Sequence, residues 1–223
     1  YRLNMFRSIH ARGFSVSESI ELMKNRPRQE IHDKLEENLK SIDLEIERLR
    51  QRRSWIEESI HLLEKREADP HAVWEEHREE SLFHPASIES DYAVAQRNAG
   101  VRTAWDEQVG MTRYAGICSG EDFAAGRPAY IDAGAAATVS DAEKFALPAD
   151  ETVRRLSMGR CVCFFIGDGD QNKLCLERHP EVKRYLEANH LKAAGELLIY
   201  YLMLYIEEDG EDLAVACLPV EKA

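Results

Sequence analysis

The chain has 223 residues, 44% of them hydrophobic, and 41 acidic against 29 basic side chains give it a formal net charge of -12. This length suffices for one large or two modest domains with a buried core, and the composition excludes a mainly disordered chain. An acidic surface repels phosphate, so the chain's own surface is not expected to bind nucleic acid. The sequence has no run of 18 apolar residues that could span a membrane, and its charged N-terminus does not resemble a secretory signal. It has five cysteines, an odd number that cannot all pair in disulfides within one chain. These features indicate a cytoplasmic protein without a disulfide framework.

The charge divides the chain into three parts, and the first reads as two short helices. Residues 1–27 carry a net charge of +3, residues 28–66 carry -1, and residues 67–223 carry -14. Apolar residues at helical spacing precede Gly13, which is a good helix stop. Ser15 and Glu18 have the spacing of a capping box and predict the start of the second helix.

The middle part is predicted to be one long amphipathic helix over residues 28–66. Its apolar residues recur in heptad spacing, which favours a coiled-coil arm over a solvated helix that lies on its own domain. An arm of this kind predicts a homodimer, because the apolar stripe is too long to leave in water. We call this stripe the seam, and it consists of Leu35, Leu39, Ile42, Ile46, Leu49, Ile56, Ile60 and Leu63.

A charged segment without an apolar repeat follows over residues 67–80 and is predicted to be a linker. From residue 81 onward the pattern alternates between strand and helix periods, which predicts an α+β domain. Strands are expected at 111–118, 128–139, 160–167, 197–206 and 212–220, and helices around Trp105 and from Pro180 to Asn189. The order predicts two strand–helix–strand–strand units, an internal duplication.

This order of segments resembles that of MerR-type transcription regulators. Residues 2–23 are similar to the segment that closes the DNA-binding domain of that family, where an arginine-rich helix ends in Gly-Phe before a short helix and the dimerisation helix. The matching positions are Arg2, Leu3, Arg7, Gly13, Phe14 and Ile20. The back half resembles the gyrase-inhibitor-like effector-binding domain of multidrug-sensing members. That match rests on the helix around Tyr185–Asn189, Gly195, the tyrosine-rich strand and Leu218-Pro219-Val220.

The resemblance implies a ligand-responsive regulator that performs no catalysis and needs no cofactor. Residues 1–27 would end a DNA-binding domain, residues 28–66 would dimerise, and residues 81–223 would bind a small lipophilic or aromatic effector. Promoter DNA would be contacted only through a region before residue 1. Multidrug sensors of this type carry a buried Glu on the last strand, where this chain has Val215. Strong selectivity for cations is therefore not expected.

The alternative to a transcription regulator is an enzyme, namely a small-molecule hydrolase of the gyrase-inhibitor-like fold. Relatives of this kind resemble enzymes that use a pocket Glu with aromatic neighbours. Val215 removes the expected carboxylate, and Glu196 could replace it if its side chain points inward.

The long strand at 197–206 offers the clearest candidate for a ligand pocket. Alternation places Tyr201, Met203 and Tyr205 on one face, and tyrosine and methionine suit an adaptable apolar wall. The alternative is that both faces of this strand are buried in the hydrophobic core and line no pocket. The resemblance favours a cleft between the two units, and the residues predicted to bind ligand are Trp105, Tyr114, Tyr130, Phe165, Tyr201, Met203 and Tyr205.

No metal site is predicted. Residues 1–117 contain no cysteine, and Cys161 and Cys163 share a strand face without a Cys-x-x-Cys motif. Asp168 begins a segment that resembles a calcium loop, but Lys173 stands where that loop needs glycine and His179 where it needs glutamate.

Overall fold

The computed structural model divides the chain into two compact units, residues 1–54 and 55–223. It describes residues 1–24, 26–86, 99–108, 110–167, 170, 173–203 and 213–223. The boundary between the units lies inside the longest helix, so that helix contributes residues to both of them.

The first unit contains two short helices and the beginning of the long one. These helices are α1 (Arg2–His10), α2 (Val16–Leu22) and the first part of α3 (Arg28–Ala68). The predicted capping box is confirmed, because Ser15 Oγ accepts from the Glu18 amide at 3.2 Å and Glu18 Oε2 accepts from the Ser15 amide at 2.8 Å. Gly13 has a φ of +95°, and Asn38 on α3 donates a hydrogen bond to the Arg12 carbonyl at 2.8 Å. The glycine therefore turns the chain at a place where a β-carbon would be strained.

The long helix α3 matches the predicted helix closely and ends two residues later than expected. Every residue of the seam is between 40% and 60% exposed, although these side chains are all large and aliphatic. A helix face of this kind is apolar, and the part of the chain that the structure describes leaves it open to solvent.

The second unit is built on an antiparallel sheet. Among the described residues, nine strands form this sheet. In spatial order the strands are β1 (Val73–Arg78), β7 (Gly159–Ile166), β11 (Leu213–Lys222), β10 (Leu197–Met203), β3 (Arg113–Cys118), β5 (Asp132–Thr138), β2 (Ser81–Pro85) and β6 (Arg154–Leu156), and β9 (Leu191–Ala193) pairs with the end of β11. A separate pair consists of β4 (Ala129–Tyr130) and β8 (Lys173–Leu174). The helices are α5 (Ala99–Glu107), α6 (Gly120–Ala124), α7 (Val139–Lys144), the short 3-10 helix η2 (Leu176–Arg178) and α8 (Pro180–Ala188).

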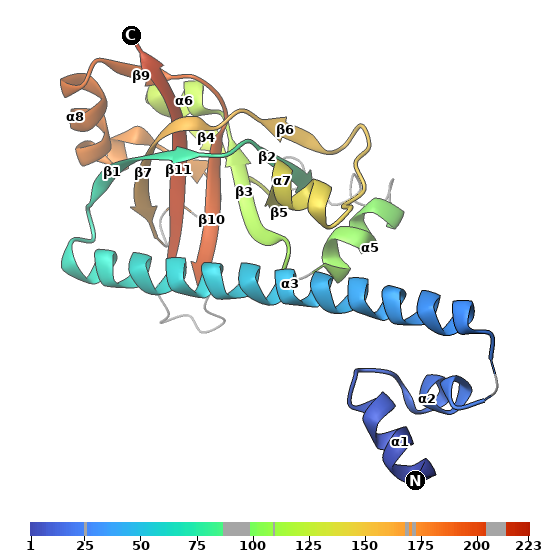
Figure 1. Ribbon diagram of the computed structural model, residues 1–223. Coiled ribbons are helices and arrows are strands. Elements are labelled where there is room, and N and C mark those ends of the chain that lie inside the picture. The colour runs from blue at the N-terminus through green and yellow to red at the C-terminus, as the bar shows by residue number, and fades with distance from the viewer. Residues whose placement is uncertain (25, 87–98, 109, 168–169, 171–172, 204–212) are drawn as a thin grey trace. The chain divides into compact units, whose positions relative to one another are not determined.

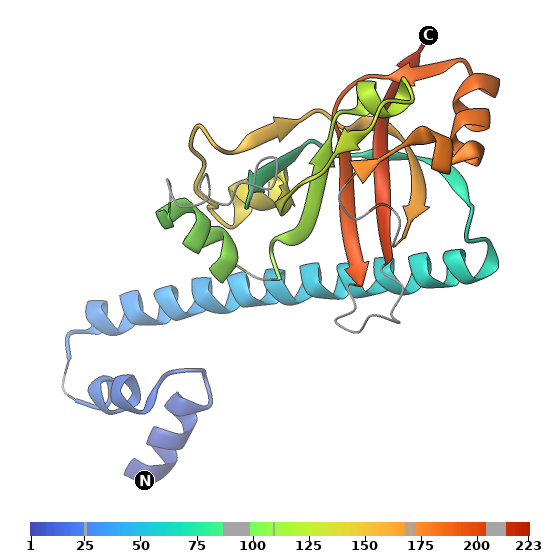
Figure 2. The ribbon, with the colours of Figure 1, turned by 180° about the vertical axis from the view of Figure 1, so that it is seen from behind.

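The predicted α+β fold with an internal duplication is confirmed by the strand order. The first half runs β2, α5, β3, β5, and the second half runs β7, α8, β10, β11. In each half the last strand lies between the other two, and the halves join where β3 pairs with β10. Figures 1 and 2 show α8 near the β7 end of this sheet and α5 and α7 near the β5 and β2 end.

The two faces of the sheet are covered differently, and we call them the helix face and the α3 face. On the helix face, Phe123 of α6 and Val182 and Leu186 of α8 pack over the second half, while Trp105 of α5 packs over the first. On the opposite face, Leu62 of α3 packs with residues of β7, β10 and β11. The final third of α3 is therefore part of the core of the second unit.

The segment 67–80 is not the linker that the charge pattern predicts, because β1 lies within it and pairs with β7. The aromatic ring of Trp74 packs against Phe165 at 5.2 Å, while Glu75 accepts hydrogen bonds from Arg160 at 2.6 and 2.8 Å. This edge strand keeps its charges because one side of it faces solvent, so it carries little apolar signal.

Two predicted strands also differ in extent. The segment 128–139 is divided into β4 and β5, and β10 is described only as far as Met203, so the end of the strand predicted at 197–206 lies outside the described residues. Within the ranges described, no helix combines the length and the apolar character that crossing a bilayer requires.

Candidate functional site

A cavity of about 310 Å³ lies on the helix face between α5 and strands β2, β3 and β5. Its volume is at the lower end of the range of ligand pockets, which begins at about 300 Å³. The cavity brings together two of the predicted ligand-binding residues, Trp105 and Tyr114. It is lined by His84, Ala86, Arg102, Trp105, Asp106, Thr112, Tyr114, Gly134 and Ala135.

The indole of Trp105 forms a rigid wall of this cavity. Its side chain is fully buried, and its Nε1 donates a hydrogen bond to the Pro148 carbonyl at 2.9 Å. The hydroxyl of Thr112 donates to the Trp105 carbonyl at 3.3 Å. Because the indole is fully buried and its N–H already has a partner, Trp105 packs in the wall of the cavity and fixes its shape.

The imidazole of His84 stacks on Trp105 with ring centroids 5.8 Å apart. Burial lowers the pKa of His84, although Asp150 and Asp106 act in the opposite direction. The ring is therefore neutral at pH 7. The carboxylate of Asp106 pairs with Arg102 at 3.3 Å. The cavity wall thus presents apolar surface and internally balanced charge.

The phenol ring of Tyr114 links the cavity to the second half of the domain. Tyr114 is 50% exposed, and its ring centroid lies 5.0 Å from that of Tyr201 on β10. Gly116 makes this approach possible, because a β-carbon there would lie 2.6 Å from Ile131 Cγ2 and 3.3 Å from the Tyr201 hydroxyl. Three of the predicted residues are thus linked, although they come from α5, β3 and β10. Trp105 and Tyr114 line the same cavity, and the ring of Tyr114 contacts that of Tyr201.

The other predicted ligand-binding residues lie elsewhere or outside the described part of the chain. Phe165 is buried on the α3 face beside Trp74, and Tyr130 is 67% exposed on β4 and is not among the residues that line the cavity. The side chain of Met203 and the whole of Tyr205 lie outside the described residues.

A polar cluster under α3 escaped the sequence analysis. Glu58 of α3 accepts a hydrogen bond from Arg78 of β1 at 3.0 Å and forms an ion pair with Arg113 of β3. The guanidinium of Arg113 also lies 4.7 Å from the ring centroid of Trp55 and 5.4 Å from that of Tyr200. A sequence signal was present, since Glu58 precedes the buried Leu62 by one helical turn and so lies on the same side of α3.

The ionisation of this cluster is set by burial and by its own partners. Burial raises the pKa of Tyr200 to about 12, so the phenol stays neutral. Burial alone would raise the pKa of Glu58, but the hydrogen bond and charge of Arg113, together with Arg78, bring it below its ordinary value. Tyr200 pairs in register with Val215, where the resemblance expects a carboxylate. Glu58 is a carboxylate on this face of the sheet, and two arginines already neutralise it.

Glu196, the candidate carboxylate of the hydrolase alternative, forms an ion pair with Arg154, and its side chain is about one-third exposed. A carboxylate that is already paired with a guanidinium is poorly placed to act as a general acid or as a free base. The structure therefore provides no support for the hydrolase alternative.

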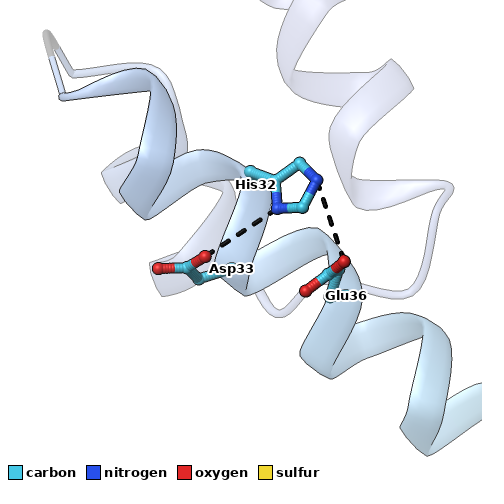
Figure 3. Close-up of side chains that lie close together, drawn as sticks. All are labelled: His32, Asp33 and Glu36. Atoms are coloured by element: carbon cyan, nitrogen blue, oxygen red, sulfur yellow. Dashed lines mark ion pairs between the residues drawn. The ribbon is translucent and has the colours of Figure 1, made fainter.

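A group of possible metal ligands lies at the start of α3 in the first unit (Figure 3). The imidazole of His32 lies 3.8 Å from a carboxylate oxygen of Asp33 and 3.8 Å from one of Glu36. All three side chains are exposed, and exposed acidic groups of this kind are common without an ion.

No protein-family model matches the chain, and no curated protein matches it. Among solved structures, the chain is similar to the crystal structure of the EcmrR C-terminal domain, with 14% identity over 68% of this chain and 98% of that chain and a TM-score of 0.40. It is also similar to the cryo-EM structure of the EcmrR–DNA complex, with 13% identity over 99% of this chain and 82% of that one and a TM-score of 0.39. A crystal structure described as a bacterial transcription regulation protein from Staphylococcus aureus matches with 15% identity over 67% of this chain and 98% of that chain, at a TM-score of 0.35. Similarity at this level leaves the function to be argued from the residues of this chain.

Proposed function

We propose that the chain is the dimerisation and effector-sensing part of a MerR-type transcription regulator. The observation that carries this proposal is the aromatic cavity under α5, which lies in a duplicated sheet domain of the kind that the sequence resemblance implies. Such a protein responds to a ligand only if the ligand binds two arrangements of the dimer with different affinity. The domain needs no catalytic group for this function.

The effector of this proposal is a small aromatic or lipophilic molecule. Tyr114 supplies exposed aromatic surface, the buried Trp105 forms part of the wall, and the neutral His84 supplies a polar contact. Asp106 is paired with Arg102, so among the described lining residues no carboxylate is left for a cationic ligand. Cationic and neutral dyes of similar size are therefore expected to bind with similar affinity, with at most a mild advantage for cations over the tyrosine rings.

Binding of lipophilic dyes to the full chain tests this function. Tyr114→Ala removes an exposed aromatic wall and is expected to weaken binding about tenfold, as the loss of an aromatic contact costs roughly 1 kcal/mol or more. Because Trp105 lines the same cavity, dye binding should also quench tryptophan fluorescence.

The matched control is Tyr130→Ala, which removes an exposed tyrosine of the same domain that does not line the cavity. This variant should bind the dyes as the parent does. Equal affinity of the parent and Tyr114→Ala, with both proteins folded, would show that the cavity is not the effector site.

The seam supports the dimeric part of the proposal. Its eight aliphatic side chains lie along one continuous helix and remain 40–60% exposed in the single chain. A second copy of α3 would cover them with the same pattern of side chains, because heptad seams are self-complementary.

A further inference from the structure

Two cysteines of the second unit face each other across neighbouring strands of the sheet. Cys163 of β7 pairs in register with Cys217 of β11, and their sulfur atoms lie 3.4 Å apart. Both residues are completely buried on the α3 face, and both are free thiols. Residues directly opposite in antiparallel strands have Cα atoms about 4.5–5.5 Å apart, which lies within the range that a disulfide bridges.

The surroundings of the pair distinguish its two sulfur atoms. The Cys163 thiol donates a hydrogen bond to Cys217 Sγ, which lowers the pKa of Cys217, and the nearby guanidinium of Arg78 lowers it further. The same hydrogen bond and burial raise the pKa of Cys163. Burial, Glu76 and Glu58 act on the pKa of Cys217 in the opposite direction, so the feature that distinguishes the two sulfur atoms is the hydrogen bond, which Cys163 donates and Cys217 accepts.

We propose that Cys163 and Cys217 are a dithiol site that small hydroperoxides oxidise to a cross-strand disulfide. The sulfur of Cys217 gives up its proton and attacks one oxygen of the peroxide, which becomes a sulfenic acid on Cys217, while the other oxygen takes up a proton and leaves as an alcohol or as water. The sulfur of Cys163 then attacks the sulfenic sulfur, gives up its proton and releases water. Two thiols and one hydroperoxide thus yield one disulfide, one water and one alcohol, or two waters when the oxidant is hydrogen peroxide.

The neighbouring cysteines are placed less favourably. Burial raises the pKa of Cys161 to about 12 and that of Cys118 to about 12, which suppresses the thiolate of both. Cys161 donates a weak hydrogen bond to the Met158 carbonyl at 3.6 Å, and Cys118 lies on the helix face, on the other side of the sheet. Among the four buried cysteines, the reaction should therefore select Cys163 and Cys217.

Cys163 lies on the strand next to the edge strand of the sheet. Strand β1 lies at that edge beside β7, and Glu76 of β1 places Oε2 3.9 Å from Cys163 Sγ. A small uncharged oxidant can enter when an edge strand opens locally, whereas a large anionic one meets steric hindrance and the charge of Glu76. Hydrogen peroxide is therefore expected to react faster than oxidised glutathione.

The test treats the full chain with hydrogen peroxide, blocks the remaining thiols and maps the unreduced peptides by mass spectrometry. The expected product is a peptide pair linked through Cys163 and Cys217 that a reductant separates. The same sample should show a midpoint of thermal unfolding that is higher by about 5 °C or more than that of the reduced protein, because the bond closes a long loop.

Serine variants provide the matched comparison. Cys163→Ser and Cys217→Ser should each abolish the linked peptide, while Cys161→Ser, on the same strand face, should leave it unchanged. The peptide map of the parent protein is decisive even if a variant fails to fold. Full alkylation of Cys163 and Cys217 after peroxide treatment, or equal linkage of Cys161 to Cys217, would overturn the proposal.

Discussion

At the scale of single residues, Glu58 decides what the α3 face of the sheet can accept. It comes from α3 and lies on this face, and its partners are Arg78 and Arg113. A buried carboxylate without a partner would attract a cationic ligand, whereas the negative charge of a carboxylate held by two guanidinium groups is already compensated. Trp55 from the same helix adds an aromatic cover over Arg113. We therefore place effector binding on the opposite, helix face.

Replacing this carboxylate tests its structural role. Glu58→Gln takes the anion away from Arg113, which is mostly buried, while Arg78 keeps its ion pair with Glu76, so we expect the free energy of unfolding at pH 7 to fall by about 1–3 kcal/mol. Because the pKa of Glu58 is lower in the folded protein, its contribution is present above the unfolded pKa of about 4.3 and is lost as the pH falls through the folded value. Urea unfolding of parent and variant at several pH values measures both effects.

The control for this change is Glu64→Gln, which alters an exposed carboxylate two turns further along α3. We expect its free energy of unfolding to stay within about 0.5 kcal/mol of the parent value. A similar loss in both variants, or a difference between Glu58→Gln and the parent that grows as the solution is acidified below pH 4, would contradict the role of Glu58.

At the scale of elements, the pairing of β5 with β2 depends on a missing side chain. Gly134 pairs with Pro85, and a β-carbon on Gly134 would lie 2.2 Å from the His84 carbonyl oxygen and 2.7 Å from the Phe83 ring. Backbone cannot move away from such a contact without opening the strand pair. The same two strands form part of the cavity wall through His84, so local pairing and the shape of the site are coupled.

A pair of glycine substitutions separates this effect from ordinary backbone preference. We expect Gly134→Ala to lower the free energy of unfolding by about 2 kcal/mol or more, because the new methyl group meets backbone. Gly100→Ala on α5, where nothing lies within 4 Å, should raise it by about 0.5–1 kcal/mol through helix propensity. Chemical denaturation measures both, and a neutral Gly134→Ala would disprove the close approach of the two strands.

At the scale of the whole molecule, the exposed seam predicts a second copy of the chain. Each buried aliphatic side chain contributes roughly 1.5–3 kcal/mol before the costs of association. Substituting Ile42→Glu together with Leu49→Glu places two charges in the seam, so we expect the parent to be a dimer at micromolar concentration and the variant to be a monomer. Light scattering coupled to size-exclusion chromatography measures the mass of each.

Leu44→Glu is the matched control for the dimer. Leu44 is an exposed aliphatic residue of the same helix but lies outside the heptad positions of the seam, so its substitution should leave the dimer intact. A monomeric parent, or a dimer that tolerates charges at positions 42 and 49, would refute dimerisation through the seam.

The sequence by itself determined the features that depend on neighbours along the chain. The heptad pattern predicted α3 to within two residues, the Ser15–Glu18 spacing predicted a capping box, and alternation predicted β3, β7 and β11 with small errors at their ends. The repeated order of strand, helix and two strands predicted the duplication that the sheet shows. Each of these signals is local, since helix and strand periods and caps act over a few residues.

Only the tertiary structure decided which distant residues meet. The edge strand β1 lies within the charged segment 67–80, Glu58 pairs with Arg113, and Cys163 lies opposite Cys217. Of the seven residues predicted to bind ligand, Trp105 and Tyr114 line one cavity and Tyr201 contacts Tyr114, whereas Phe165 lies on the other face of the sheet. These outcomes depend on strand register and strand order, and a sequence period gives the alternation of a strand without naming its partner or the side of the sheet that each set of residues will occupy.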